Sequence, residues 1–130
     1  MKKLSAFLVL FLVVLSCDSD DDNNVGLIGD WQLVEVLADP GDGSGTFMPV
    51  TSSNIMTFNT DGTVTSNGVM CHISINATMP SAGIYSSDRM FFKTDACGLP
   101  DYEYTFEING DLLTFSVPCI EPCGARYRKL

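Results

Sequence analysis

The sequence predicts an all-β protein, in which a small antiparallel meander of about eight strands closes as a β-barrel. Three observations support this fold class. Short runs rich in Val, Ile, Thr, Phe and Tyr recur along the chain, separated by turn pairs. The runs are evenly spaced, which is typical of barrels and sandwiches. No segment after residue 16 keeps a helical period over three turns. Closure is favoured because it removes the exposed edges of the sheet.

The expected strands follow one another along the chain. They cover residues 31–37, 56–59, 63–65, 71–77, 83–86, 89–93, 103–108, 113–117 and 125–129. The first opens with Trp31 after a Gly29-Asp30 turn, and Asp61-Gly62 joins the second to the third. Each run is short and rich in β-branched or aromatic residues, which pack well on a pleated sheet.

The clearest pair of strands lies between residues 103 and 117. In the first strand Tyr104, Phe106 and Ile108 alternate with polar side chains, so that one face is dry and the other is wet. Asn109-Gly110 supplies the positive φ of a tight hairpin turn. The second strand continues the dry face with Leu113, Phe115 and Val117.

The segment 38–50 is too rich in Gly, Pro and Asp to form a strand, and we expect a flexible loop at the rim of the barrel. Phe47 and Met48 would fold over the mouth of the barrel from this loop. Asp39, Asp42 and Ser44 leave calcium binding as an alternative, since oxygen ligands suit that ion. The spacing is not that of an EF-hand, and the bidentate acid is missing.

The first 16 residues have the features of a secretory signal. Lys2 and Lys3 precede an apolar run over residues 6–15, which is too short to cross a bilayer. Val14-Leu15-Ser16-Cys17 resembles the lipobox of bacterial lipoproteins. That resemblance implies that Cys17 becomes the first residue of the mature protein and carries acyl chains, which would hold it at a membrane. The alternative is an ordinary signal with an incidental cysteine.

Residues 17–26 read as the lipidated cysteine and a solvated acidic tether, because the tract contains four Asp and no apolar run. Ser19-Asp20-Asp21 resembles the export signal of Bacteroidota surface lipoproteins, which implies an outer-membrane protein at the cell surface. Asp18 keeps a periplasm-facing location open, because in enteric bacteria an Asp at this position favours retention in the inner membrane.

Residues 27–130 form a single expected domain, which is large enough for one core. Without residues 1–16 the chain has five Lys and Arg against 16 Asp and Glu, a formal charge of −11. Such a surface repels phosphate, so we expect no nucleic-acid partner. Nothing in the sequence indicates a cofactor.

Four cysteines remain besides Cys17, and an even count in a small exported domain favours two disulfides. Three pairings are possible. We expect Cys71–Cys97, which would join distant segments, and Cys119–Cys123, which would close a tight loop.

The Gly29-Asp30-Trp31 motif, followed by a meander of short strands, resembles the lipocalin family, in particular short lipocalin-like domains of Bacteroidota lipoproteins. The resemblance covers residues 28–130 and implies that Trp31 plugs the closed end of the barrel. A basic side chain from the last strand, Arg126 or Arg128, would stack on the indole. The helix that follows the last strand in full-length lipocalins has no counterpart here.

The interior of such a barrel either holds one small apolar ligand or is filled by its own side chains. If a ligand binds, we expect it to contact the dry-face aromatic residues and the rim. These candidates are Phe47, Met48, Phe58, Tyr104, Phe106 and Phe115.

A second family is a rival for the same region. The pattern of META-type domains of bacterial lipoproteins is loosely followed by Phe58, Asp61-Gly62, Cys71, Tyr85, Thr94 and Cys97. Those domains carry an amphipathic helix after the second cysteine. Here Pro100 and the alternating strand from residue 103 occupy that place, which counts against this family.

No catalytic constellation stands out, and we expect no enzyme. His72 is the single histidine, and as a neighbour of Cys71 on a strand it would face the opposite side, so a surface position is expected. Met70-Cys71-His72 offers soft ligands for copper, but methionine as core filler is the simpler interpretation, and we expect no metal. The sequence thus predicts a lipid-anchored envelope module, with a small apolar ligand or with a filled barrel that contacts other proteins.

Overall fold

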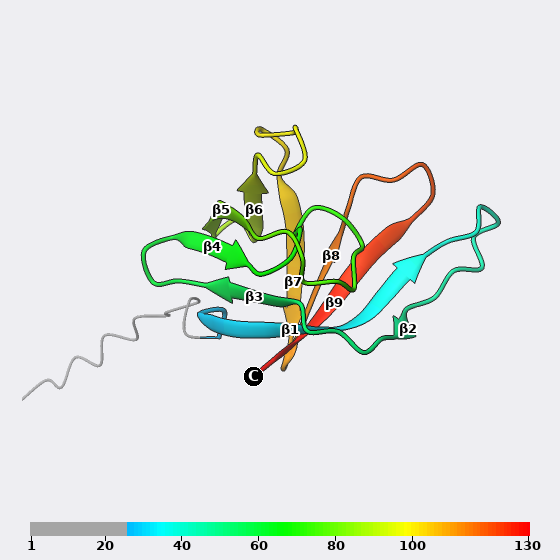
Figure 1. Cartoon of the computed structure of the whole chain (residues 1–130), viewed down its shortest axis with the longest axis horizontal. Coiled ribbons are helices and arrows are strands. Elements are labelled where there is room, and N and C mark those ends of the chain that lie inside the picture. The colour runs from blue at the N-terminus through cyan, green and yellow to red at the C-terminus, as the bar shows by residue number, and fades with distance from the viewer. Residues whose placement is uncertain (1–25) are drawn as a thin grey trace, which may run out of the picture.

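The structure is a computed structural model, which describes residues 26–130. Nine β-strands make up its regular structure (Figure 1). They are β1 (Gly29–Ala38), β2 (Met48–Pro49), β3 (Ile55–Phe58), β4 (Thr63–Ser66), β5 (Ser81–Ser86), β6 (Phe91–Thr94), β7 (Tyr104–Asn109), β8 (Leu112–Ser116) and β9 (Cys123–Lys129). The predicted signal, Cys17 and most of the predicted tether lie outside the described residues.

Eight of the strands form a closed antiparallel meander, which confirms the predicted fold class. The order is β1-β3-β4-β5-β6-β7-β8-β9, and β9 returns to pair with β1. The closing register runs from Trp31 opposite Lys129 to Ala38 opposite Cys123, with a bulge between Leu33 and Glu35. The short β2 is an additional strand that pairs only with the second half of β1, so the prediction that the segment 38–50 forms no strand is wrong at these two residues.

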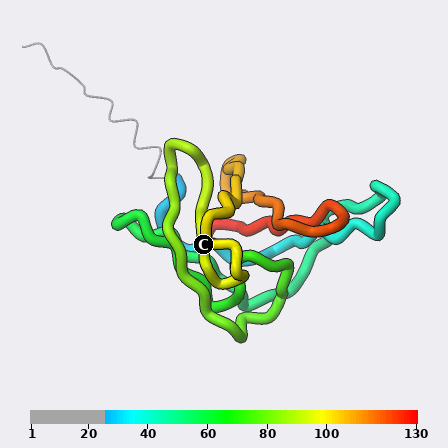
Figure 2. The backbone as a smooth tube through the Cα atoms, turned by 90° about the horizontal axis from the view of Figure 1, so that it is seen from above, coloured from blue at the N-terminus to red at the C-terminus, as the bar shows by residue number. Residues whose placement is uncertain are grey.

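The connections differ strongly between the two ends of the barrel. One end, here called the tight-turn end, carries the turns 59–62, 87–90 and 110–111 together with residues 26–28 and Leu130. The other, here called the long-loop end, carries the segments 39–54, 67–80, 95–103 and 117–122. Figure 2 shows the segments 39–54 and 117–122 reaching far out from the strands. Gly62 and Gly110 take positive φ in two of the tight turns, as hairpin geometry requires.

The core fills the inside of the barrel. Its largest fully buried side chains include Trp31, Phe58, Phe92, Tyr104 and Tyr127. The predicted alternation of β7 is confirmed, because the side chains of Tyr104 and Phe106 are buried whereas those of Thr105 and Glu107 are exposed. Each aromatic side chain buried in this way contributes on the order of 2–3 kcal/mol to folding.

One predicted strand is wrong. Residues 71–77 are not in the sheet but lie within the segment 67–80 at the long-loop end. The cause is the register of the neighbouring strands, since β4 pairs directly with β5, Thr65 opposite Ala82, and leaves no edge for an intervening strand. Strand β6 also starts later than expected, because Met90 takes a positive φ in the turn before it.

Candidate functional site

The interior of the barrel brings together four of the six predicted ligand-binding residues. Phe58 and Phe106 lie 5.6 Å apart between ring centroids. The ring of Phe92 stacks on Tyr104 at 4.9 Å and meets Phe115 edge-on at 5.1 Å. These centroid distances are those of aromatic pairs in direct contact. The dry faces therefore pack against one another across the barrel.

Phe47 and Met48 lie apart from the other four candidates. The ring of Phe47 rests on the outer face of the barrel, 4.0 Å from the guanidinium of Arg126. Gly124 makes room for it, since a Cβ at that position would come within 3.4 Å of the ring. Met48 is on β2, with 61% of its surface exposed. The structure therefore brings neither residue to the interior.

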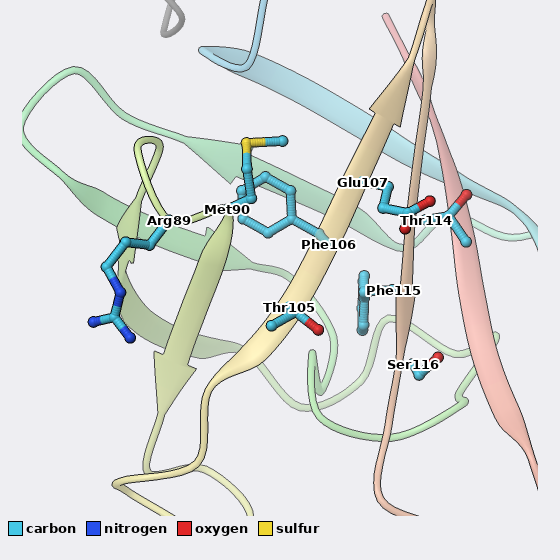
Figure 3. A pocket seen from close by; sticks show the side chains of 8 residues that line it. All are labelled: Arg89, Met90, Thr105, Phe106, Glu107, Thr114, Phe115 and Ser116. Carbon is cyan, nitrogen blue, oxygen red and sulfur yellow. The ribbon is translucent and has the colours of Figure 1, made fainter.

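Four hollows of about 320 to 560 Å³ lie on the outer surface of the described chain. The smallest is bordered by residues of β7 and β8, with Arg89 and Met90 at one side (Figure 3). Its lining combines the polar side chains of Thr105, Glu107, Thr114 and Ser116 with Met90 and with Phe106 and Phe115, two of the predicted ligand-binding residues. This mixed lining is more polar than that of the usual small-molecule pocket, which is predominantly apolar.

Trp31 lies on β1 near the tight-turn end of the barrel. Its side chain is fully buried, and its indole Nε1 donates a hydrogen bond of 2.8 Å to the carbonyl of Leu27. The cation above the ring is the ammonium of Lys129, with Nζ 4.9 Å from the centroid. Lys129 also donates to the carbonyls of Gly26 and Ile28, at 2.6 and 2.5 Å. Burial of the amine lowers the pKa of Lys129.

The expectation that Arg126 or Arg128 stacks on Trp31 is therefore wrong. Trp31 lies directly opposite Lys129 in the β1–β9 register, so the two side chains share a face. Arg128 is exposed and pairs with Asp111 at 3.3 Å. Arg126 pairs with Glu35 and donates to the hydroxyl of Thr114 at 3.2 Å.

A buried polar cluster closes the long-loop end. Asn54 is fully buried; its Oδ1 accepts from Ser66 Oγ at 3.0 Å, and its Nδ2 donates to the carbonyl of Ser74 at 3.3 Å. Ser52 Oγ donates to the carbonyl of Ile75 at 2.6 Å. These bonds hold the segment 67–80 against the barrel. Sequence reasoning missed the cluster, since isolated Ser and Asn residues look like ordinary turn residues.

Both expected disulfides are present. Cys71–Cys97 joins segments 67–80 and 95–103 across a sequence separation of 26 residues. Cys119–Cys123 closes a short loop with a separation of four. Cys71 is buried in the core, and Cys123 begins β9.

The acidic loop considered for calcium uses its oxygen atoms internally. The carboxylate of Asp39 accepts backbone N–H bonds from Gly45, Gly41 and Gly43, at 2.6, 2.7 and 3.1 Å. The bonds from Gly45 and Gly41 are the main reason why the pKa of Asp39 is lowered. Asp42 likewise accepts from the backbone and the hydroxyl of Ser44. The two acids therefore shape the loop.

The residues considered for copper are not grouped as ligands. Met70 is fully buried, and the sulfur of Cys71 is bonded to Cys97. His72 is exposed. Within residues 26–130, no group of three or more His, Cys, Asp or Glu residues is arranged to hold a metal ion.

One buried polar atom stands out in the interior. The hydroxyl of Tyr104 has no hydrogen-bond partner within the described chain, although the residue is almost completely buried. The ring centroid of Tyr102 lies 4.7 Å from the ring centroid of Tyr104. Burial raises the pKa of Tyr104, and Tyr102 adds to the shift. A buried hydroxyl without a partner is costly, by about 1–3 kcal/mol.

Comparisons with known proteins add no relative. No family model matches the sequence, and no similar protein was found among curated proteins or among solved structures. The lipocalin resemblance stays a prediction, and the barrel topology is consistent with it. Residues 26–130 contain no helix that is long and apolar enough to span a membrane.

Proposed function

We propose that this protein is a lipid-anchored envelope lipoprotein whose filled barrel serves as an interaction module. The observation that carries the proposal is the packing of the interior. Phe58, Tyr104, Phe106 and Phe115 are the residues with which a ligand would be held, and they contact other core aromatics. When the inside of a barrel is occupied by its own side chains, its outer surface is left to meet a partner.

Cys17 is the residue that carries the acyl chains in this proposal, and it lies outside the described residues. The ten residues from Cys17 to Gly26 span at most about 30 Å when extended. Gly26 is bonded to Lys129 at the tight-turn end. This end therefore faces the membrane in the proposal, and the long-loop end points away from it. Two or more acyl chains on Cys17 would give stable attachment, and we place the protein in the outer membrane, at the cell surface.

A small apolar ligand is the second candidate. The unpartnered hydroxyl of Tyr104 favours it, because a ligand with one polar group would satisfy that atom. Entry of such a ligand requires that the aromatic side chains around Tyr104 move apart.

Native mass spectrometry of the chain purified from cell envelopes tests both candidates. The expected protein starts at Cys17, carries acyl chains and two disulfides, and brings no small molecule with it. A co-purified apolar compound would favour the second candidate. The Cys17→Ser variant is expected to leave the membrane fraction, and its persistence there would refute the lipid anchor.

A further inference from the structure

We propose that the long-loop end is a docking face for a positively charged polypeptide segment with apolar side chains. The proposal rests on the function proposed above and names the surface and the chemistry of the partner. It depends on four observations: the loops form one surface, they expose apolar side chains, they carry uncompensated negative charge, and they lie opposite the anchored end.

The four segments of the long-loop end are tied into one surface. The amide of Asp39 donates to the carbonyl of Pro122 at 3.0 Å, which joins the segments 39–54 and 117–122. Ser52 and Asn54 bind the backbone of the segment 67–80. The Cys71–Cys97 disulfide then joins that segment to 95–103. Surfaces held in this way lose little conformational entropy when a partner binds.

Most of the exposed large apolar side chains of the described residues lie at this end. Eight large apolar side chains are exposed among the described residues, and six of them belong to the four segments. The six are Met48, Ile75, Met79, Leu99, Tyr102 and Ile120. The other two are Ile84 and Leu130. Concentration of apolar side chains at one end of a small domain is typical of an interaction site.

Ile120 is the most prominent of these side chains. It is fully exposed, at the tip of the loop closed by the Cys119–Cys123 disulfide. Nothing in the fold of the described chain requires an apolar residue there, since water surrounds it. A single exposed side chain on a constrained loop is well suited to enter a pocket of a partner.

The charge of the long-loop end is negative throughout. The four segments contain no Lys or Arg. Five of their acids form no ion pair within residues 26–130: Asp39, Asp42, Asp95, Asp101 and Glu121. All five Lys and Arg of the described chain lie on the strands or in the tight turns. This potential attracts a cationic partner and repels nucleic acid and anionic lipid.

The position of the face agrees with the proposed anchor. The chain leaves the described region at Gly26, at the tight-turn end. A tether attached there keeps the long-loop end away from the bilayer and open to another protein. Its acidic residues also favour separation from anionic lipid.

Fluorescence anisotropy tests the docking face with a defined probe. The probe is a short synthetic peptide in which Lys alternates with Leu, and the matched peptide carries Glu in place of Lys. The full-length chain is purified from whichever cell fraction contains it. We expect the Lys peptide to bind, with an affinity that falls as salt is added, and the Glu peptide not to bind.

Variants locate the binding site on the surface. Ile120→Ser is expected to weaken binding of the Lys peptide about tenfold, as for an interface anchor. The triple variant Asp95→Asn, Asp101→Asn, Glu121→Gln is expected to have a similar effect and to reduce the salt dependence. Ile84→Ser and Asp88→Asn are the matched controls outside the long-loop end, and both should leave the affinity within about twofold. Fluorescence of buried Trp31 reports whether each variant is folded.

Several results would overturn the docking face. These are equal binding of the Lys and Glu peptides, equal losses in the control variants, self-association of the chain, or adsorption of the long-loop end to anionic vesicles. The lipid anchor is scored separately by fractionation of Cys17→Ser. Peptide binding by a protein that is not lipidated would support the docking face and refute the lipid anchor. A lipidated protein that does not bind the Lys peptide would support the lipid anchor and refute the docking face.

Discussion

Removal of each disulfide in turn is expected to destabilise the protein by different amounts, and the structure provides the magnitudes. Cys71–Cys97 closes a loop with a separation of 26 residues, and Cys119–Cys123 closes one with a separation of four. On the chain-entropy model these constraints contribute about 3.5 and about 2 kcal/mol to the free energy of unfolding. Loss of the first is a large fraction of the ~5–15 kcal/mol that stabilises a typical domain.

The assay is equilibrium urea unfolding of the full-length double variants Cys71→Ala with Cys97→Ala, and Cys119→Ala with Cys123→Ala. The single tryptophan, Trp31, is fully buried and reports the transition by its fluorescence. We expect the first variant to lose more stability than the second by about 1.5 kcal/mol. Equal losses, or a greater loss in the second variant, would refute the reasoning from loop length.

Three further predictions concern single residues. Lys129→Ala should lower the free energy of unfolding by about 1–2 kcal/mol, because the cation over the indole of Trp31 is lost. The control Arg128→Ala should change the free energy of unfolding by less than about 1 kcal/mol. Urea unfolding measures both variants. Gly83→Ala places a Cβ 2.0 Å from a backbone oxygen of β6 and should lower the free energy of unfolding by about 1–3 kcal/mol or more. In the control Gly26→Ala the Cβ meets nothing within 4 Å, so the free energy of unfolding should not change in the same assay. The carboxylate of Asp39 has a lowered pKa in the folded state, so its stabilisation of the loop is present above pH 3.8 and is lost as the pH falls through the folded pKa. The protection of the loop amides, taken relative to intrinsic exchange at each pH, should fall in acid for the wild type, and Asp39→Asn should show low protection already at neutral pH.

The sequence was sufficient for the fold because its strongest signals are local. Alternation in β7, with Tyr104 and Phe106 buried, needs only a period of two. Asn109-Gly110 marks its turn, and the cysteines left few pairings to choose from. Each of these features depends on residues that are neighbours in the chain or on a small number of combinations.

The features that sequence reasoning missed depend on register. Whether Lys129 or Arg128 faces Trp31 changes with a shift of one residue between β1 and β9, and periodicity does not specify that shift. The β-rich segment 71–77 is kept out of the sheet by the direct pairing of β4 with β5. Asn54 draws its partners from Ser66 and Ser74, and nothing local marks it as buried.

In the candidate site, too, some positions follow from local sequence signals and others depend on distant contacts. Burial of Phe58 and Phe115 follows from the apolar faces of their strands. The position of Phe47 does not, because its place on the outer wall depends on the space left by Gly124 and on the cation of Arg126. Exposure of Ile120 depends on the direction in which a disulfide-closed loop points.

The pairing of the first strand with the last has a consequence for folding during the export that we propose for this chain. Trp31 meets Lys129 only when both ends of the domain have emerged, 98 residues apart. Such distant contacts form late, since the chain entropy must be lost before they stabilise anything. When a polypeptide passes through a secretion channel from its amino terminus, such a barrel cannot close until β9 has passed as well. The same topology disfavours closure of the barrel on the cytosolic side before the last strand has been synthesised.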